Sequence, residues 1–184
     1  MLLWQKQKLA KLRAMYFDAL TKAMSMLAKQ PNTLFVGQAV AFDGQAAFKT
    51  FAGVPMERRI ELPVAEDFQM GFCTGLALQG YLPICFYPRF DFLLMACNQL
   101  INHLDKFPLM GPFAPKVIIR TAVGRKKPLD PGPQHTGNYS HSFRQMLRTV
   151  DVFECPTADL VATAYSEALR SKRSSIVVET MENY

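Results

Sequence analysis

Apolar positions along the chain recur with two different periods, and segments of the two kinds alternate. Near the amino terminus, apolar side chains recur every three or four residues, at Leu9, Leu12, Tyr16, Leu20, Met24 and Leu27. This spacing is typical of a helix with one buried face. Further on, compact runs of β-branched and aromatic residues end at Gly or Pro, as buried strands do, and the clearest run is at residues 116–121. The pattern therefore predicts helices that alternate with short strands.

The expected elements follow one another along the whole chain. Helices are predicted at residues 5–29, 66–80, 91–106 and 157–170, and strands at residues 34–36, 59–62, 82–87, 116–121, 152–155 and 175–179. Short apolar strands separated by helices indicate βαβ units, because parallel strands need a long crossover connection. We therefore expect a single α/β domain over residues 1–184, doubly wound, with a mainly parallel sheet and helices on both faces.

Sheets of this kind bind ligands beyond the carboxyl ends of their strands. The segments in that position are residues 38–44, 63–66, 88–92 and 122–141. The stretch at residues 121–142 contains three Gly and three Pro, so no regular element is expected there. Ordered loops longer than about 12–15 residues are usually functional, and His135 lies in the middle of this one.

Composition and charge limit the kinds of partner that the chain is expected to bind. Hydrophobic residues make up 49% of the chain and charged residues 20%, which is a globular composition. The net charge of +6 is spread along the chain with short clusters at residues 6–13, 125–127 and 170–173. No recognisable nucleic-acid module accompanies them, and a partner surface with acidic character explains the charge equally well. No apolar run reaches the ~20 residues of a membrane span, so neither a nucleic-acid nor a membrane partner is expected.

Four cysteines lie in apolar stretches without a CxxC pair. They predict small buried side chains in a reducing compartment, and therefore a cytoplasmic protein without disulfides or a metal site. The pattern contains no Gly-rich phosphate loop, no metal-spaced His/Cys cluster and no nucleophile elbow. Composition and spacing alone therefore identify no activity.

Several short motifs, taken in order, are more informative. Residues 62–72 read LPVAEDFQMGF, and Gly75, Ala77 and Gly80 precede the run YLPI. These resemble the "TPISE-x-G-x-x-G" helix entry and the "G-A-A-x-x-G-x-R-P" continuation of the beta subunits of pyruvate and branched-chain 2-oxo acid dehydrogenases. Further matches are "F-x-F…D-Q-x-x-N" at residues 90–102, "P-x-V-x-R" at 117–120, "Q-H-S" at 134–136, and the last two strands. With nearly ungapped spacing from about residue 17 onward, the chain resembles the pyrimidine-binding domain of thiamine-diphosphate enzymes, a fold also found in transketolases.

The resemblance implies roles for four residues. In that family a glutamate hydrogen-bonds a ring nitrogen of the cofactor's aminopyrimidine and favours its imino tautomer, and Glu66 is the matching residue. Phe92 matches the aromatic side chain that packs on the pyrimidine, with Phe90 as neighbouring support. His135 matches a histidine that lines the substrate side and transfers protons. From position alone, Glu66 would be an ordinary acid in the first turn of a helix, and Phe92 an ordinary core ring.

The resemblance also implies a partner. The acidic pair that the family carries after the first strand is replaced by Gln38 and Ala39, and Ala65 stands before Glu66 where the family has serine. No "GDG…N" signature for magnesium and diphosphate is found, and no diphosphate-binding or carboxyl-terminal domain is expected. Magnesium would then be held by a diphosphate-binding alpha-type subunit, in an α2β2 assembly in which this chain also dimerises. Residues 91–112 are the expected interface, with core burial as the competing explanation.

The expected function is that of one subunit of a thiamine-diphosphate enzyme that decarboxylates or oxidises a 2-oxo acid, incomplete without its partner. Two alternatives stay open at this point. One is a subunit for transketolase-like two-carbon transfer, and the other is a non-catalytic regulatory module that retains the fold.

Overall fold

A computed structural model describes residues 3–124 and 131–184 of the chain. Its six strands form a single sheet in the order β2-β1-β3-β4-β6-β5, and every neighbouring pair is parallel. In chain order the strands are β1 (Thr33–Gly37), β2 (Arg59–Glu61), β3 (Leu82–Phe86), β4 (Ile118–Val123), β5 (Asp151–Cys155) and β6 (Ser175–Thr180). The predicted parallel α/β fold is confirmed, although β4 begins two residues later than expected.

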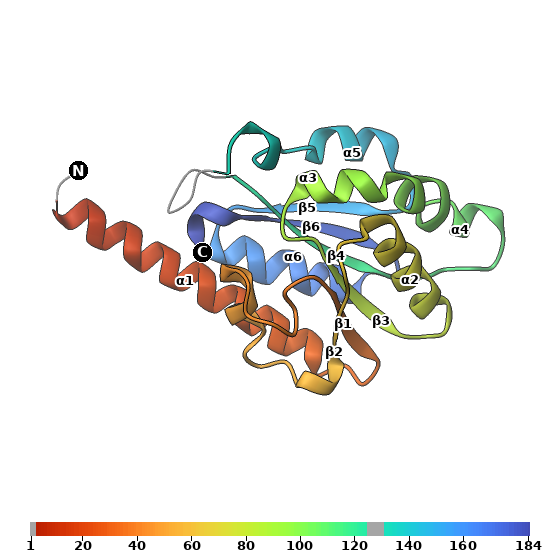
Figure 1. Cartoon of the computed structure of the whole chain (residues 1–184), viewed down its shortest axis with the longest axis horizontal. Helices are drawn as coiled ribbons and strands as arrows, with labels where there is room; N and C mark the ends of the chain where they lie inside the picture. Colours follow the sequence, from red (N-terminus) through yellow and green to blue (C-terminus); the bar gives the residue numbers. More distant parts are fainter. Residues whose placement is uncertain (1–2, 125–130) are drawn as a thin grey trace.

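Helices cover both faces of this sheet (Figure 1). One face is covered by α1 (Leu3–Ala28), α6 (Ala158–Arg170) and the 3-10 helix η1 (Ala46–Phe51), whose apolar side chains form one core with the sheet. The other face is covered by α2 (Glu66–Leu78), α3 (Phe90–Leu93) and α5 (Ser140–Met146), which form a second core. The four inner strands, β1, β3, β4 and β6, are mostly buried for this reason, as their apolar runs require, whereas the edge strands β2 and β5 are mostly half-buried.

The helix predicted at residues 91–106 is the main error in the expected elements. The structure divides it into α3, the 3-10 helix η3 (Leu94–Ala96) and the π-helix η4 (Asn98–Leu104), and the short helix α4 (Phe107–Met110) follows. The Asp105 amide donates to the Leu100 carbonyl 2.9 Å away, five residues back, and this wider turn leaves both Leu104 and Asp105 buried. The buried Asp105 carboxylate accepts hydrogen bonds from the Arg148 and Thr149 amides at 2.9 and 2.7 Å. The interruption of the helix therefore places a carboxylate that holds the connection between α5 and β5.

The structure also bears on several smaller predictions, of which the first was wrong. Helix α5 occupies part of the stretch expected to be a loop, so His141 is an exposed helical residue. The four cysteines are free, as predicted, and all except the half-buried Cys97 are buried. Among the helices of the described ranges, none combines the length and the apolar character needed to cross a membrane. The basic cluster at residues 125–127 lies outside the described residues.

Candidate functional site

The first turn of α2 lies at the carboxyl edge of the sheet and is fixed to the end of β3. The Tyr87 hydroxyl donates to the backbone carbonyl of Glu66 at 2.9 Å. Gln69, which is fully buried, donates through Nε2 to the Phe86 carbonyl, also at 2.9 Å. Burial above all raises the pKa of Tyr87 well above its usual value, so the phenol stays protonated and remains a donor. Glu66 therefore starts α2 from a position set by β3.

The Glu66 side chain is half-buried, and its carboxylate has no hydrogen-bond partner within the described parts of the chain. It occupies the first residue of α2, where the partial positive charge of the helix end favours an anion. Nearby, Asp67 is exposed, and the amide nitrogen of Gln99 lies 3.5 Å from its carboxylate. The geometry thus leaves one carboxylate at the sheet edge, held by its backbone and available to a ligand.

Phe92 and His135 meet at the same edge. Their ring centroids are 5.3 Å apart at an interplanar angle of 65°, an edge-to-face contact, and both side chains are half-buried. Nδ1 of His135 is buried without a hydrogen-bond partner among the described residues. The sequence prediction placed these two residues in one site although they are far apart in the chain, and the structure brings them together.

Phe90 has a different environment. It is completely buried, with Tyr139 edge-on at 5.6 Å and Phe143 at 5.3 Å between ring centroids. A ring enclosed in this way packs beneath the surface and cannot itself touch a ligand. Phe90 thus packs beneath the segment that carries Phe92, and its role as neighbouring support for a cofactor-binding ring stays a prediction.

Arg89 was not anticipated as a site residue. Its Nη1 donates to the carbonyls of Gly124 at 2.7 Å and His135 at 3.0 Å. The arginine therefore connects the segment after β3 to both described parts of the loop after β4. Its only signal in the sequence was a cation in one of the segments expected beyond a strand's carboxyl end. Glu66, Phe92 and His135 are thus all fixed by residues 86–92.

Arg89→Met should loosen the turn that carries His135. Charge-assisted hydrogen bonds contribute about 1.5–3 kcal/mol each, so the His135 amide should exchange with deuterium roughly tenfold faster or more. Arg58→Met is the matched control, because Nη1 of Arg58 also donates to two carbonyls, those of Ala28 and Gln30, at 2.5 and 2.8 Å. Unchanged exchange at His135 in Arg89→Met would show that the arginine does not position it.

A second carboxylate shapes the loop after β1. Glu61, at the end of β2, accepts the consecutive amides of Ala39, Val40 and Ala41 at 2.6, 2.9 and 2.8 Å. Ala39 has φ +54°, a left-handed conformation that turns these amides toward one anion. Glu61 thus organises the very turn in which this chain lacks the acidic residues expected from the resemblance. Sequence spacing gave no hint of it, because the contact joins neighbouring strands.

A buried ion pair lies in the sheet beneath this edge. Arg120 of β4 donates from Nε and Nη2 to Glu179 of β6 at 2.8 and 3.0 Å, and both side chains are completely buried. Burial alone would lower the pKa of Arg120, but the charge of Glu179 outweighs it and raises the pKa above its usual value. The guanidinium also lies 4.9 Å from the ring centroid of Phe51 and 5.0 Å from that of Phe86. This pair links the side chains of β4 and β6 and so stabilises the pairing of these two strands.

Surface hollows lie elsewhere. Five hollows formed by described residues have none of Glu66, Phe92 and His135 in their walls, and the largest, about 480 Å³, lies between α1 and α6. In the same described ranges, no group of three or more His, Cys, Asp or Glu side chains could hold a metal ion. The candidate site is therefore described by the polar groups at the sheet edge and not by any of these five hollows.

Comparisons with known proteins identify the family of this chain. The family described as "Transketolase, pyrimidine binding domain" matches residues 13–184. A pyruvate dehydrogenase E1 component subunit beta from Cyanidium caldarium is 26% identical over 170 residues, which cover 89% of this chain and 51% of that protein. A mitochondrial 2-oxoisovalerate dehydrogenase subunit beta from Chaetomium thermophilum is 32% identical over 97 residues, 50% of this chain and 20% of that protein. The chain thus spans about half the length of its pyruvate dehydrogenase relative.

A solved structure has the same fold. It is a split-gene transketolase described as an inactive beta4 tetramer, with a TM-score of 0.68 and 21% sequence identity, and the match covers 89% of this chain and 50% of that one. Together with the family match, this confirms the resemblance inferred from the motifs.

Proposed function

Because the chain belongs to the family of transketolase pyrimidine-binding domains, we propose that it forms the pyrimidine half of a thiamine-diphosphate site in a two-subunit enzyme. The observation that carries this proposal is the environment of the Glu66 backbone and carboxylate. Its backbone is fixed by Tyr87, while its carboxylate has no hydrogen-bond partner in the described chain and sits at the carboxyl edge of a parallel sheet.

The residues present match the pyrimidine end of that cofactor. When bound, thiamine diphosphate supplies the carbanion chemistry. Glu66 would hold a proton at a pyrimidine ring nitrogen, the Phe92 ring would pack on the pyrimidine, and His135 would donate or accept a proton on the substrate side. Magnesium and the diphosphate would belong to an alpha-type partner. The unpartnered, buried Nδ1 of His135 supports its place in a polar site that is completed by another molecule.

The choice of reaction is supported by the relatives of the chain. Decarboxylation or oxidation of a 2-oxo acid is the proposed activity, since the matching curated proteins are beta subunits of pyruvate and 2-oxoisovalerate dehydrogenases. Transketolase-like two-carbon transfer is the second candidate, supported by the fold of the split-gene transketolase. Either would take place in a cytoplasmic α2β2 assembly. The stretch at residues 91–112 supports the partner contact only in part. Leu93, Leu100 and Leu104 are core residues, whereas Met95 and Met110 are 69% and 63% exposed.

Cofactor binding by the chain with and without its partner tests this proposal. A tagged chain expressed in its own cells should copurify with a diphosphate-binding protein, and the complex should bind thiamine diphosphate only when magnesium is present. The isolated chain should bind at least roughly tenfold more weakly, because it holds half of the contacts. Isothermal titration of both samples gives the comparison. Tight, magnesium-dependent binding by the chain alone would contradict the half-site.

A further inference from the structure

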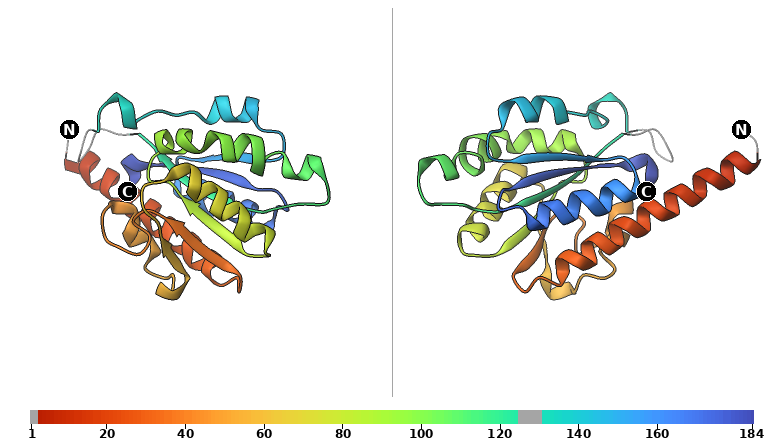
Figure 2. Two further views of the ribbon diagram at one scale, coloured as in Figure 1. Left: turned by 45° about the vertical axis from the view of Figure 1, so that its right-hand side comes forward. Right: turned by 180° about the vertical axis from the view of Figure 1, so that it is seen from behind.

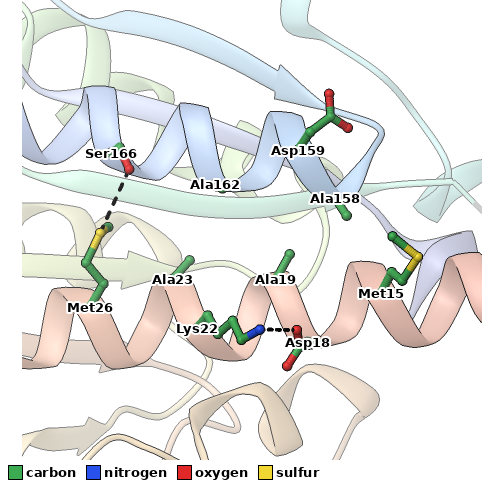
Figure 3. A pocket seen from close by; sticks show the side chains of 10 residues that line it. All are labelled: Met15, Asp18, Ala19, Lys22, Ala23, Met26, Ala158, Asp159, Ala162 and Ser166. Carbon is green, nitrogen blue, oxygen red and sulfur yellow. Dashed lines mark hydrogen bonds and ion pairs between the residues drawn. The ribbon is translucent and has the colours of Figure 1, made fainter.

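Helices α1 and α6 lie side by side on one face of the sheet and leave a groove between their outer surfaces (Figure 3). The groove has a volume of about 480 Å³. Its walls are mostly small or apolar side chains, Ala19, Ala23, Met15 and Met26 from α1 and Ala158 and Ala162 from α6. A second hollow of about 260 Å³ shares Met15, Ala158 and Asp159 with it and reaches Leu9 and Leu12. The two hollows are therefore neighbours along α1.

The beginning of α1 projects beyond the body of the domain (Figure 2). We call residues 3–15 the arm. All the fully buried residues of α1 come after the arm, the first of them being Tyr16. Within the arm, Leu3, Trp4, Leu12 and Met15 are exposed, by 73%, 57%, 51% and 49%. A helical segment of this length is marginal in water without packing, and its apolar side chains point to a surface that covers them.

The apolar side of the arm is continuous with the groove. Trp4, Leu12, Met15, Ala19, Ala23 and Met26 succeed one another at multiples of three or four residues along α1. Positions with this spacing share one face of a helix. A helix laid against that face would thus contact the arm at one end and the groove walls at the other.

The charges of the two parts are opposite. The arm carries Lys6, Lys8, Lys11 and Arg13, and no acidic residue occurs between positions 3 and 17. The groove is lined by Asp18, Lys22 and Asp159, so its charged side chains carry one net negative charge. Asp18 forms an ion pair with Lys22, with Nζ 2.7 Å from Oδ2, whereas Asp159 has no ion-pair partner in the described ranges. A basic arm and a groove of net negative charge on one chain are complementary in an assembly of two copies.

We propose that two copies of this chain pair through antiparallel α1 helices, with the arm of each in the α1–α6 groove of the other. A twofold axis at Met15 satisfies this arrangement, because Trp4 lies eleven residues before Met15 and Met26 eleven residues after it. The indole of one copy then reaches Met26 of the second copy, where small alanines leave room for it, and Lys11 approaches Asp18. Such an interface is isologous and closed. It adds a self-association face to the proposed subunit, apart from residues 91–112, and needs no cofactor.

Sedimentation velocity of the purified chain tests the pairing. The chain should sediment as a dimer at micromolar concentration. Ala162→Glu, which places a charge in the groove, and Trp4→Ala, which removes the arm's largest apolar group, should each raise the dissociation constant at least tenfold. Leu160→Glu is the matched control, since Leu160 is exposed on α6 but lines neither hollow, and circular dichroism verifies the fold of each variant. A chain that stays monomeric, including one that instead binds anionic phospholipid vesicles, would overturn the proposal.

Cross-linking tests the axis itself. Met15→Cys should form a disulfide-linked dimer under mild oxidation, because the two copies of this position face each other. Ala10→Cys, exposed on the opposite side of α1, and the parent chain with its native cysteines provide the background. Equal cross-linking at positions 10 and 15, or a dimer unaffected by Ala162→Glu, would place the interface elsewhere. Neither experiment involves thiamine diphosphate, so its outcome is independent of the proposed function.

Discussion

Replacing Glu66 with glutamine is expected to lower the turnover of the assembled enzyme by a factor of about 10²–10⁴, the usual contribution of a positioned acid or base. The side chain keeps its size but loses the ability to hold a proton at the pyrimidine ring. Folding should be unaffected, because the contact that Glu66 makes with the fold uses its backbone carbonyl and the Tyr87 hydroxyl. Steady-state turnover of the reconstituted complex, with the unfolding midpoint of the chain measured in parallel, separates the two effects.

Asp67→Asn is the control for this variant. Asp67 is an exposed acid next to Glu66 on the same turn, so its substitution makes the same change in net charge without touching the proposed site. It should leave turnover within about twofold, in keeping with the small effect of surface charges. Glu66→Gln with wild-type turnover would remove the assignment of this residue.

The second large effect is on stability. Glu179→Gln should lower the free energy of unfolding by about 3–5 kcal/mol, because it leaves the buried Arg120 guanidinium without a counter-charge. Both side chains are completely buried, and Glu179 also accepts the hydroxyls of Tyr165 and Tyr184. Urea unfolding followed by circular dichroism measures the change.

Two further variants test whether the loss of stability comes from the unpaired buried charge. Glu154→Gln removes an exposed pair with Arg144, whose side chains are 38% and 41% exposed, and should cost less than about 1 kcal/mol. The double variant Arg120→Met/Glu179→Leu removes both charges and should recover most of the lost stability, since buried pairs are often replaceable by apolar residues. A loss below about 1 kcal/mol in Glu179→Gln would show that the buried pair is not a major stabilising contact.

The fold was predictable because the four inner strands, β1, β3, β4 and β6, are apolar runs that are mostly buried. The run at residues 175–179, for example, became β6, with five successive buried residues from Ser175 to Glu179. The break within residues 91–106 was not predictable, because apolar residues spaced three or four apart do not distinguish an α-helix from an α-helix interrupted by a π-helical turn. Helix α5 was missed because it is short and has only Ser140 and Phe143 buried.

Parts of the site were predictable for a different reason. The motif around Glu66 and the Gln134–His135 pair carried the resemblance, so the sequence alone assigned them to one candidate site. Arg89, Glu61 and the Arg120–Glu179 pair depend on which strands are neighbours and in what register, for example Ala122 opposite Glu179. Local spacing does not contain that information. A charged residue inside an apolar strand, as in Arg120, was the single sequence signal for a buried partner.

The most direct measurement is the rate at which the thiazolium C2 proton of thiamine diphosphate exchanges with deuterium in the assembled complex, followed by quench and NMR. The proposed role of Glu66 predicts fast exchange in the wild-type complex and exchange slowed at least a hundredfold in Glu66→Gln. Equal exchange rates in the two complexes, at saturating cofactor, would contradict it.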